Sequence, residues 1–492
     1  MTPSNASTIP VGLFALEARL RQDLQWLGLP AKRWVPPQTG REVLDTLVIG
    51  GGMAGLALAA SLTHLGIQAV VFDRAPAGFE GPWATTARME TLRSPKELTG
   101  PALGLPALTF RAWFESQFGT AAWSQLDKIP RLQWAEYLVW YRKVLALDVR
   151  NHQTVQAVLP RGDGVVQIDL IDRSGEIPRS NQMLARHVVL ATGRDGLGGP
   201  WVPTWAHELP RHSWMHSSDV WDGATLKGLR VAVVGAGASA MDAAATALVS
   251  GATRVDLLIR RADLPRINKG KGAGHPGMAH GFWNLPDEWK WRFRHYINVQ
   301  QVPPPHGSTL RVSRHANVHF HLGAAALGAT AHADGSLRIE TPKGPLAADC
   351  MIFCTGFRTD WAMRPEFAAF ASHVRLWRDR YEAVPGEGDE ELSGAPDLGP
   401  VFEFQPKTPG DCPGLERVHC FNYAATLSHG AATGDIPQIT EGAQRLARGI
   451  ASRLMVEDVA FHYGSMQRYA EPELLGDEWT PAEFPRYDED AV

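Results

Sequence analysis

The sequence predicts an α/β protein with two Rossmann-like dinucleotide-binding domains, preceded by an N-terminal helical extension. Two glycine-rich turns predict this fold, because each follows a short apolar run and precedes an alanine-rich run. The turns open at Gly50 and Gly235, and an apolar run follows each alanine-rich run. Repeated strand–helix–strand units of this kind form parallel sheets that are covered by helices.

The composition is that of a globular protein and argues against disordered, nucleic-acid-binding and membrane-spanning proteins. Hydrophobic residues make up 44% and charged residues 20% of the 492, which argues against a largely disordered chain. The net charge of −4 argues against a nucleic-acid partner, because such domains are basic. No apolar run approaches the ~18 residues of a membrane span, and a signal-peptide pattern is missing. We therefore expect a cytoplasmic protein without a membrane partner, and leave open whether it forms a homo-oligomer.

Residues 1–42 predict the helical extension. Gly28 and Pro30 would end the helix. Its apolar stripe follows helical spacing and consists of Leu13, Leu16, Leu20, Leu24 and Leu27. We expect this stripe to pack on the main body.

The first glycine turn predicts a dinucleotide-binding loop. Strand 43–49 precedes it, helix 56–65 follows, and the second strand covers 69–72. In the pattern G-x-G-x-x-G, the glycines permit a tight turn, close approach of a pyrophosphate and helix packing. Asp73 ends the second strand, where a carboxylate can bind ribose hydroxyls. The residues predicted to contact this dinucleotide, which we take to be FAD, are Gly50, Gly52, Met53, Ala54, Gly55, Asp73, Arg74 and Trp83.

The second glycine turn predicts a different dinucleotide. It has the pattern G-x-G-x-x-A, between strand 230–234 and helix 241–249, and strand 255–259 ends at Arg260 and Arg261. Arginine at this place accommodates a 2′-phosphate, which favours NADPH over NADH; the alternative is that both arginines are solvated surface charges. The predicted contacts are Gly235, Gly237, Ala238, Ser239, Ala240, Arg260 and Arg261.

Further segments resemble those of class B flavoprotein monooxygenases, which include flavin-containing, Baeyer–Villiger and N-hydroxylating enzymes. The resemblance covers roughly residues 43–455. Residues 188–193 and 350–357 resemble the two strands that end in Thr-Gly, and 216–221 resembles the linker before the NADPH loop. The resemblance implies cofactor contacts at Thr192, Gly193, Thr355, Gly356, Gly434 and Asp435.

The match to any one subgroup is incomplete. In the linker fingerprint, His212 stands in place of a glycine and Val220 in place of an aromatic residue. Residues 89–96 and His429-Gly430 are more similar to the N-hydroxylating enzymes, whereas the linker is more similar to the other two subgroups. The sequence therefore leaves the reaction type open.

The resemblance implies a discontinuous FAD domain, 43–215 and 346–492, with the NADPH domain 216–345 inserted in it. A helix is expected at 439–454, after Gly434-Asp435. The glycine-rich segment 264–301 predicts a lid-like or substrate-access loop, in which Lys269 and Lys271 could add to 2′-phosphate binding. The acidic run 387–391 is expected to be a solvated surface segment.

The implied function is that of a single-component FAD- and NADPH-dependent monooxygenase. Such an enzyme uses O₂ and a C4a-(hydro)peroxyflavin to oxygenate a small organic substrate. Baeyer–Villiger insertion or N-hydroxylation, in secondary metabolism, is the expected reaction. The candidate catalytic residues are Arg93, Lys96, His216 and Ser217. No metal is expected, because His315, His319 and His321 do not share one face of a helix or strand.

Two alternatives remain on the sequence alone. One is an NADPH-dependent flavin reductase or dehydrogenase without oxygenation. Its disulfide-reductase form is disfavoured, because the four cysteines include no CxxC pair. The other is a non-enzymatic dinucleotide sensor, which two intact loops with different ribose chemistry disfavour.

Overall fold

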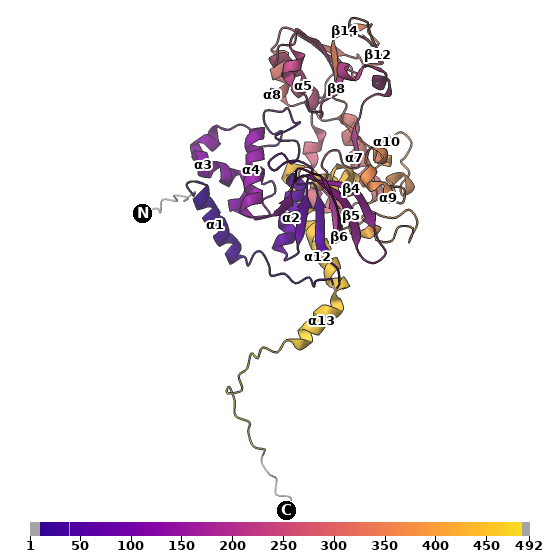
Figure 1. The fold of residues 1–492 in the computed structure, drawn as a ribbon. Coiled ribbons are helices and arrows are strands. Elements are labelled where there is room, and N and C mark those ends of the chain that lie inside the picture. The colour runs from indigo at the N-terminus through magenta and orange to yellow at the C-terminus, as the bar shows by residue number, and fades with distance from the viewer. Residues whose placement is uncertain (1–9, 39, 485–492) are drawn as a thin grey trace, which may run out of the picture.

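The computed structural model describes residues 10–38 and 40–484. Figure 1 shows two sheet-containing domains, with the domain that holds α5 and β8 above the larger one and helix α1 beside α3 and α4. The helices are α1 (Leu13–Trp26), α2 (Met53–His64), α3 (Phe110–Gln125), α4 (Arg131–Val144), α5 (Ala238–Val249), α6 (Pro276–Gly281), α7 (Asp287–Gln300), α8 (His306–Ser313), α9 (Ala368–Ala371), α10 (Glu390–Ser393), α11 (Thr426–His429), α12 (Ile439–Glu457) and α13 (Val459–Arg468).

The first sheet carries the first glycine turn. Strand β1 lies between β2 and β6 and pairs in parallel with both, so its carboxyl end opens toward a crevice. The chain rejoins this sheet near its end, where β17 pairs with β6. In spatial order the strands are β3 (Asp148–Arg150), β2 (Ala69–Phe72), β1 (Leu44–Ile49), β6 (Arg179–Leu190), β5 (Val166–Asp172) and β4 (Gln153–Pro160), with β17 (Val418–Cys420) also beside β6.

The second sheet carries the second glycine turn, and its strand pairs are parallel. In spatial order its strands are β11 (Val318–Leu322), β10 (Arg254–Ile259), β9 (Arg230–Val234), β15 (Cys350–Phe353) and β8 (Trp214–His216). A small antiparallel sheet of β12 (Gly328–Ala331), β13 (Leu337–Glu340) and β14 (Leu346–Ala348) precedes β15. Strands β7 (Gly198–Pro200) and β16 (Phe357–Thr359) pair where the chain passes between the domains.

The predicted boundaries of the inserted domain need correction. Strand β15 was expected in the second FAD segment, 346–492, but it pairs with β9 on one side and β8 on the other. Its fully buried residues satisfy their backbone hydrogen bonds inside the second sheet. The second sheet therefore extends from β8 to β15, and the chain returns to the first sheet only at β17.

Both predicted strand–helix–strand units are present, but their helices start earlier than expected. Helix α2 begins at Met53 and α5 at Ala238, inside the glycine motifs. The last residues of each motif form the first helical turn, where backbone N–H groups have no partner within the helix. Each motif thus places a helix N-terminus at the carboxyl end of a parallel strand.

The segment 264–301 is not a loop throughout. It contains α6 and the 14-residue helix α7. Trp291 of α7 is 1% exposed and packs with Trp377, Leu392 and Leu427 of the larger domain. Figure 1 shows α7 beside α10, at the junction of the two domains. A helix held by a buried tryptophan bridges the domains where a lid-like or substrate-access loop was expected.

The chain ends follow the predicted pattern in most respects. Leu16 and Leu20 of α1 are buried, and the Gly12 N–H donates to Ser116 O of α3 at 2.6 Å. Leu27 lies beyond α1 and is exposed, which differs from the predicted stripe. Helix α12 starts at Ile439 as predicted and ends three residues later than expected. Within residues 10–38 and 40–484, no helix is long and apolar enough to cross a membrane.

Candidate active site

The first glycine turn has the geometry of a phosphate-binding loop. A Cβ on Gly55 would lie 1.9 Å from Gly50 O, so only glycine lets α2 start this close to β1. Gly50 has a φ of 110°, and a Cβ there would lie 2.4 Å from Ala191 O. The nearest atom to a Cβ on Gly52 would be Gly81 Cα at 3.8 Å, so this side of the loop is open. The free N–H groups at the start of α2 therefore adjoin open space, as in anion sites at helix N-termini.

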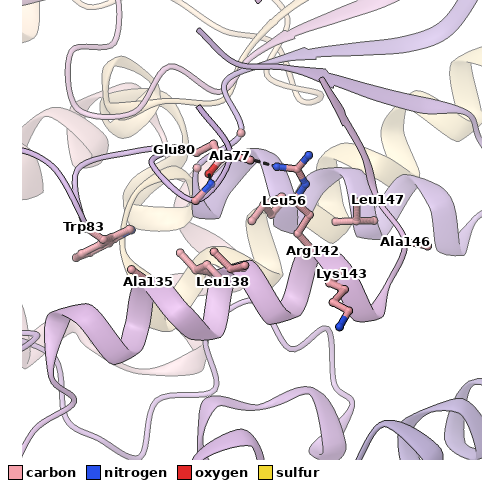
Figure 2. A pocket seen from close by; sticks show the side chains of 14 residues that line it. Leu56, Ala77, Glu80, Trp83, Ala135, Leu138, Arg142, Lys143, Ala146 and Leu147 are labelled. Carbon is pink, nitrogen blue, oxygen red and sulfur yellow. Dashed lines mark hydrogen bonds and ion pairs between the residues drawn. The ribbon is translucent and has the colours of Figure 1, made fainter. Parts of the chain in front are cut away.

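A cavity of about 410 Å³ lies beside this loop, between Gly51-Gly52 and helix α4. Figure 2 shows Trp83 at one end, with Leu138 and Arg142 projecting from α4. Arg142 Nη1 pairs with Glu80 Oε1 at 2.7 Å, which ties α4 to the segment after β2. The open loop and this adjoining cavity fit the adenosine and pyrophosphate parts of FAD.

Asp73 shapes the loop as well as offering a ribose contact. Its Oδ2 accepts a hydrogen bond from the Gly51 N–H at 2.7 Å, and its Oδ1 accepts one from Ala75 at 2.8 Å. Burial raises the pKa of Asp73. The neighbouring Arg74 is exposed. Each oxygen of Asp73 keeps lone-pair capacity, so a ribose hydroxyl could still donate to it.

The second glycine turn packs against the end of β15. A Cβ on Gly235 would lie 2.8 Å from Cys354 O, whereas a Cβ on Gly237 would meet nothing within 4 Å. Ala240 is fully buried, so its methyl group is accommodated where the first loop needs glycine. The second loop therefore has the same open middle position as the first loop.

The two arginines after β10 differ in their surroundings. Arg261 Nη2 donates to Val299 O near the end of α7. Arg260 is exposed, and within residues 10–38 and 40–484 it forms no hydrogen bond or ion pair. Arg260 is thus the arginine whose side chain is available to bind a 2′-phosphate. Arg261 instead holds the end of α7 through its hydrogen bond to Val299.

Asn422 connects two segments that were predicted to contact the flavin, those of Thr192 and of Thr433. No pattern in the sequence singled out Asn422 for this role. Its Nδ2 donates to Thr192 Oγ1 at 3.1 Å, and its backbone carbonyl accepts from Thr433 Oγ1 at 2.7 Å. Asn422 thereby fixes Thr192-Gly193 beside Gly434-Asp435. Gly434 and Asp435 are exposed, and partial burial of the Asp435 carboxyl raises its pKa.

Arg93 lies where the two domains meet, beside α5. Its Nη2 is 3.3 Å from Asp242 Oδ2 of α5, and 44% of the Arg93 side chain is exposed. Asp242 is buried, which raises its pKa, and its Oδ1 has no hydrogen-bond partner among the described residues. This pair spans the two domains, so Arg93 stays a candidate for contact with substrate or nicotinamide.

Lys96 occupies a different place from the one predicted. Its Nζ donates to Trp123 O at 2.9 Å and to Leu126 O at 2.6 Å, at the end of α3. A lysine ammonium stabilises the free carbonyls of a helix C-terminus. This geometry gives Lys96 a structural role, and its catalytic role stays a prediction.

His216 and Ser217 lie beside the second glycine loop. The His216 ring is buried, Nδ1 is 2.7 Å from Ser218 Oγ, and burial lowers the pKa of the ring. Ser217 lies within hydrogen-bond reach of the Cys354 thiol, whose pKa is raised by burial to about 12. Thr355 Oγ1 donates to Trp201 O, and Gly356 accepts from Trp201 N at 2.9 Å. These contacts position the linker, and the thiol stays protonated.

A group of arginines at the domain junction was not predicted. The Arg194 guanidinium lies 4.1 Å from the centre of the Tyr423 ring. Arg294 of α7 lies near Tyr423, Glu391 and Arg194, and these three groups contribute to the shift of its pKa. Arg358 of β16 also lies near Glu391, and its positive charge lowers the pKa of that carboxyl. We call Arg194, Arg294, Arg358, Glu391 and Tyr423 the junction cluster.

The expectation for the acidic run 387–391 holds only in part: Glu390 and Glu391 are exposed, whereas Glu387 and Asp389 hold α7. Glu387 O accepts a hydrogen bond from Trp291 Nε1 at 2.8 Å, and Asp389 Oδ2 accepts one from Asn298 at 3.0 Å. Burial raises the pKa of Glu391, which faces arginines. The run lies at the domain junction because its polar groups pair with a helix from the other domain.

The comparisons with known proteins agree with this arrangement. Residues 116–298 match the family model for L-lysine 6-monooxygenase/L-ornithine 5-monooxygenase. The chain is 38% identical to an FAD-dependent urate hydroxylase from Xanthomonas campestris pv. campestris, over 95% of this chain and 98% of that protein. The chain belongs to the class B flavin-dependent monooxygenases. The predicted enzyme class is thereby confirmed, and FAD and NADPH are supported as its cofactors.

Solved structures show the fold of this monooxygenase in related enzymes. A Kutzneria ornithine N-hydroxylase, solved with reduced FAD, NADP⁺ and L-ornithine, has a TM-score of 0.65 and 17% identity, covering 84% of this chain and 99% of that one. A cadaverine monooxygenase from Erwinia amylovora, bound to FAD, has a TM-score of 0.64 and 16% identity, covering 91% of this chain and 100% of that one. These likenesses confirm the α/β fold with dinucleotide-binding domains. The contacts of individual residues with the cofactors stay predictions.

Proposed function

We propose that this monooxygenase hydroxylates urate or a closely related oxidised purine, with NADPH as the reductant. The relative that acts on urate carries the proposal, because its 38% identity extends over 95% of this chain. The proposed reaction consumes one O₂ and one NADPH, adds one oxygen atom to the purine and releases the other as water. It differs from Baeyer–Villiger insertion and from N-hydroxylation of an amine, the reactions expected from the sequence.

The charge of the domain junction supports an anionic substrate. Three arginines, Arg194, Arg294 and Arg358, lie near Glu391, and their charges lower its pKa against the effects of burial and of Asp389. Ornithine, lysine and cadaverine carry ammonium groups, which such a cluster would repel. Urate is an anion at neutral pH and bears several carbonyl oxygens, so it suits a cationic site.

Each part of the chain has a defined task in this proposal. The open loop Gly50–Gly55 would bind the FAD pyrophosphate, and the loop at Gly235 would bind that of NADPH. FAD, when bound and reduced, supplies the means to activate O₂. Around it, Asn422 fixes the neighbouring segments, and α7 closes the junction between the domains. A closed junction limits water, which otherwise diverts reducing equivalents to H₂O₂.

The test compares substrates of opposite charge on the purified holoenzyme. Urate, xanthine, L-ornithine and cyclohexanone are each added with NADPH, while O₂ uptake, H₂O₂ and product mass are recorded. Urate should raise NADPH consumption and yield a product with one added oxygen atom and little H₂O₂. Turnover of L-ornithine with no response to urate would overturn the proposal and favour amine N-hydroxylation.

A further inference from the structure

The junction cluster lies next to the predicted flavin segments. The Tyr423 N–H donates to Gly193 O at 3.1 Å, and the adjacent Asn422 bonds to Thr192 and Thr433. The cluster is therefore attached to the ends of β6 and of the Thr433–Asp435 segment. A ligand at Tyr423 would lie at the junction that these segments form.

Arg294 has fewer partners than Arg292 on the same helix, and Tyr423 is its hydrogen-bond partner in the junction cluster. Its Nε is buried and has no hydrogen-bond partner among the described residues. Burial lowers the pKa of Arg294, and the repulsion from Arg194 adds to this effect. By contrast, Arg292, two residues earlier, pairs with Glu288 at 2.7 Å and with Glu387 at 3.6 Å. A buried guanidinium donor without a partner is costly, so a bound acceptor would stabilise this site.

The cluster has one carboxylate for its three arginines. Burial raises the pKa of Glu391 first of all, and Asp389 raises it further. Glu391 and the neighbouring Asp389 are the carboxylates near these arginines, and among the described residues neither forms an ion pair with them. The phosphates of both dinucleotides have their own loops, at Gly50–Gly55 and at Gly235. The unbalanced charge is thus available to a third, anionic molecule.

We propose that Arg294, supported by Arg194 and Tyr423, binds the anionic, carbonyl-bearing edge of the substrate and selects oxidised purine anions over amines. This proposal deepens the proposed function and rests on it. The guanidinium group presents its N–H donors in a flat fork, which matches two acceptors on one edge of a planar ring. Because Arg294 comes from the inserted domain, substrate binding would also hold α7 against the larger domain.

The experiment measures binding and turnover separately, on holoenzyme loaded with FAD. Urate is titrated without O₂ or NADPH by isothermal calorimetry, and KM and kcat are then measured with NADPH. The variants are Arg294→Gln, Arg294→Lys and, as a matched control on the same helix, Arg292→Gln. Far-UV circular dichroism and FAD content show whether each variant is folded.

Arg294→Gln should weaken urate binding and raise its KM by about 10- to 100-fold, because a hydrogen bond to a charged group is lost. Arg294→Lys should recover part of the affinity, since the charge returns without the fork. KM for NADPH and the rate of flavin reduction should stay within about twofold of wild type. Arg292→Gln should bind urate as the wild type does.

The outcomes separate this inference from the proposed function. If the wild type binds urate but does not hydroxylate it, and Arg294→Gln abolishes binding, the function is wrong and the role of Arg294 holds. If a folded Arg294→Gln binds and turns over urate like the wild type, the role of Arg294 is wrong and the function holds. If the wild type neither binds nor hydroxylates urate, both are overturned.

Discussion

The two arginines after β10 provide a sharp test of how this monooxygenase recognises its reductant. Arg260 is exposed and unpaired among the described residues, whereas Arg261 donates to Val299 O near the end of α7. Arg260→Ala should therefore weaken NADPH binding through the lost contact with the 2′-phosphate. Arg261→Ala should instead loosen α7 and leave the choice between NADPH and NADH almost unchanged.

The expected size of the effect follows from the exposure of Arg260. A hydrogen bond to a charged group contributes about 1.5–3 kcal/mol, and solvent screening at an exposed side chain favours the lower end. A loss of about 1.4 kcal/mol raises KM for NADPH about tenfold. NADH has no 2′-phosphate, so its KM should change by less than about twofold.

The assay is steady-state NADPH and NADH oxidation by wild type, Arg260→Ala and Arg261→Ala, with thermal unfolding of each. The ratio of kcat/KM for NADPH to that for NADH should fall about tenfold only in Arg260→Ala. Arg261→Ala should lower the melting temperature. Equal effects of Arg260→Ala on both nucleotides would refute the 2′-phosphate argument, and a loss of preference only in Arg261→Ala would reverse the two roles.

Three further predictions concern the loop, the bridging helix and a buried histidine. Gly55→Ala should lose FAD, because its Cβ would lie 1.9 Å from Gly50 O; Gly307→Ala, with open space around it, should keep one FAD per chain by absorbance. Trp291→Ala should lower the free energy of unfolding in urea by about 3–5 kcal/mol, while Trp289→Ala, at 48% exposure, should change it little. Burial lowers the pKa of His419 to about 3, so the folded state keeps it neutral while the unfolded state binds a proton below about pH 6.5. As the pH is lowered below that value, the free energy of unfolding should therefore decrease by about 1.4 kcal/mol per pH unit for this group. His419→Gln should make this pH dependence weaker, and an unchanged dependence would contradict a neutral His419 in the folded state.

Local patterns predicted the parts of the site that a single segment forms. The residues around Gly50 and Gly235 specify a strand, a turn and a helix within about twenty residues, as expected for such motifs. The close contacts of Gly55 and Gly50 are consequences of that local geometry. Contacts between distant segments had no comparable signal. Asn422 and Arg294 could not be singled out, because their partners lie far away in the chain.

Lys96 and the acidic run show how the same residue types take different roles in the folded chain. Lys96 looked like a candidate for flavin chemistry, but the end of α3 brings two carbonyl groups to its ammonium. The run 387–391 looked solvated, but α7 crosses from the other domain and pairs with it. In both cases polar groups form hydrogen bonds with a distant segment, and the spacing of residues in the sequence does not reveal such a partner.

The sequence by itself determined the two glycine loops and the α/β fold, because these depend on short-range patterns of backbone conformation and burial, and its resemblance to class B monooxygenases indicated the class of enzyme. Only the tertiary structure decided that β15 belongs to the second sheet, that α7 bridges the domains and that Arg194, Arg294 and Arg358 come together near Glu391. Strand order, helix docking and charge balance depend on which distant segments share a surface. Hydrophobic burial of residues such as Trp291 sets those contacts, and the charge of the junction follows from them.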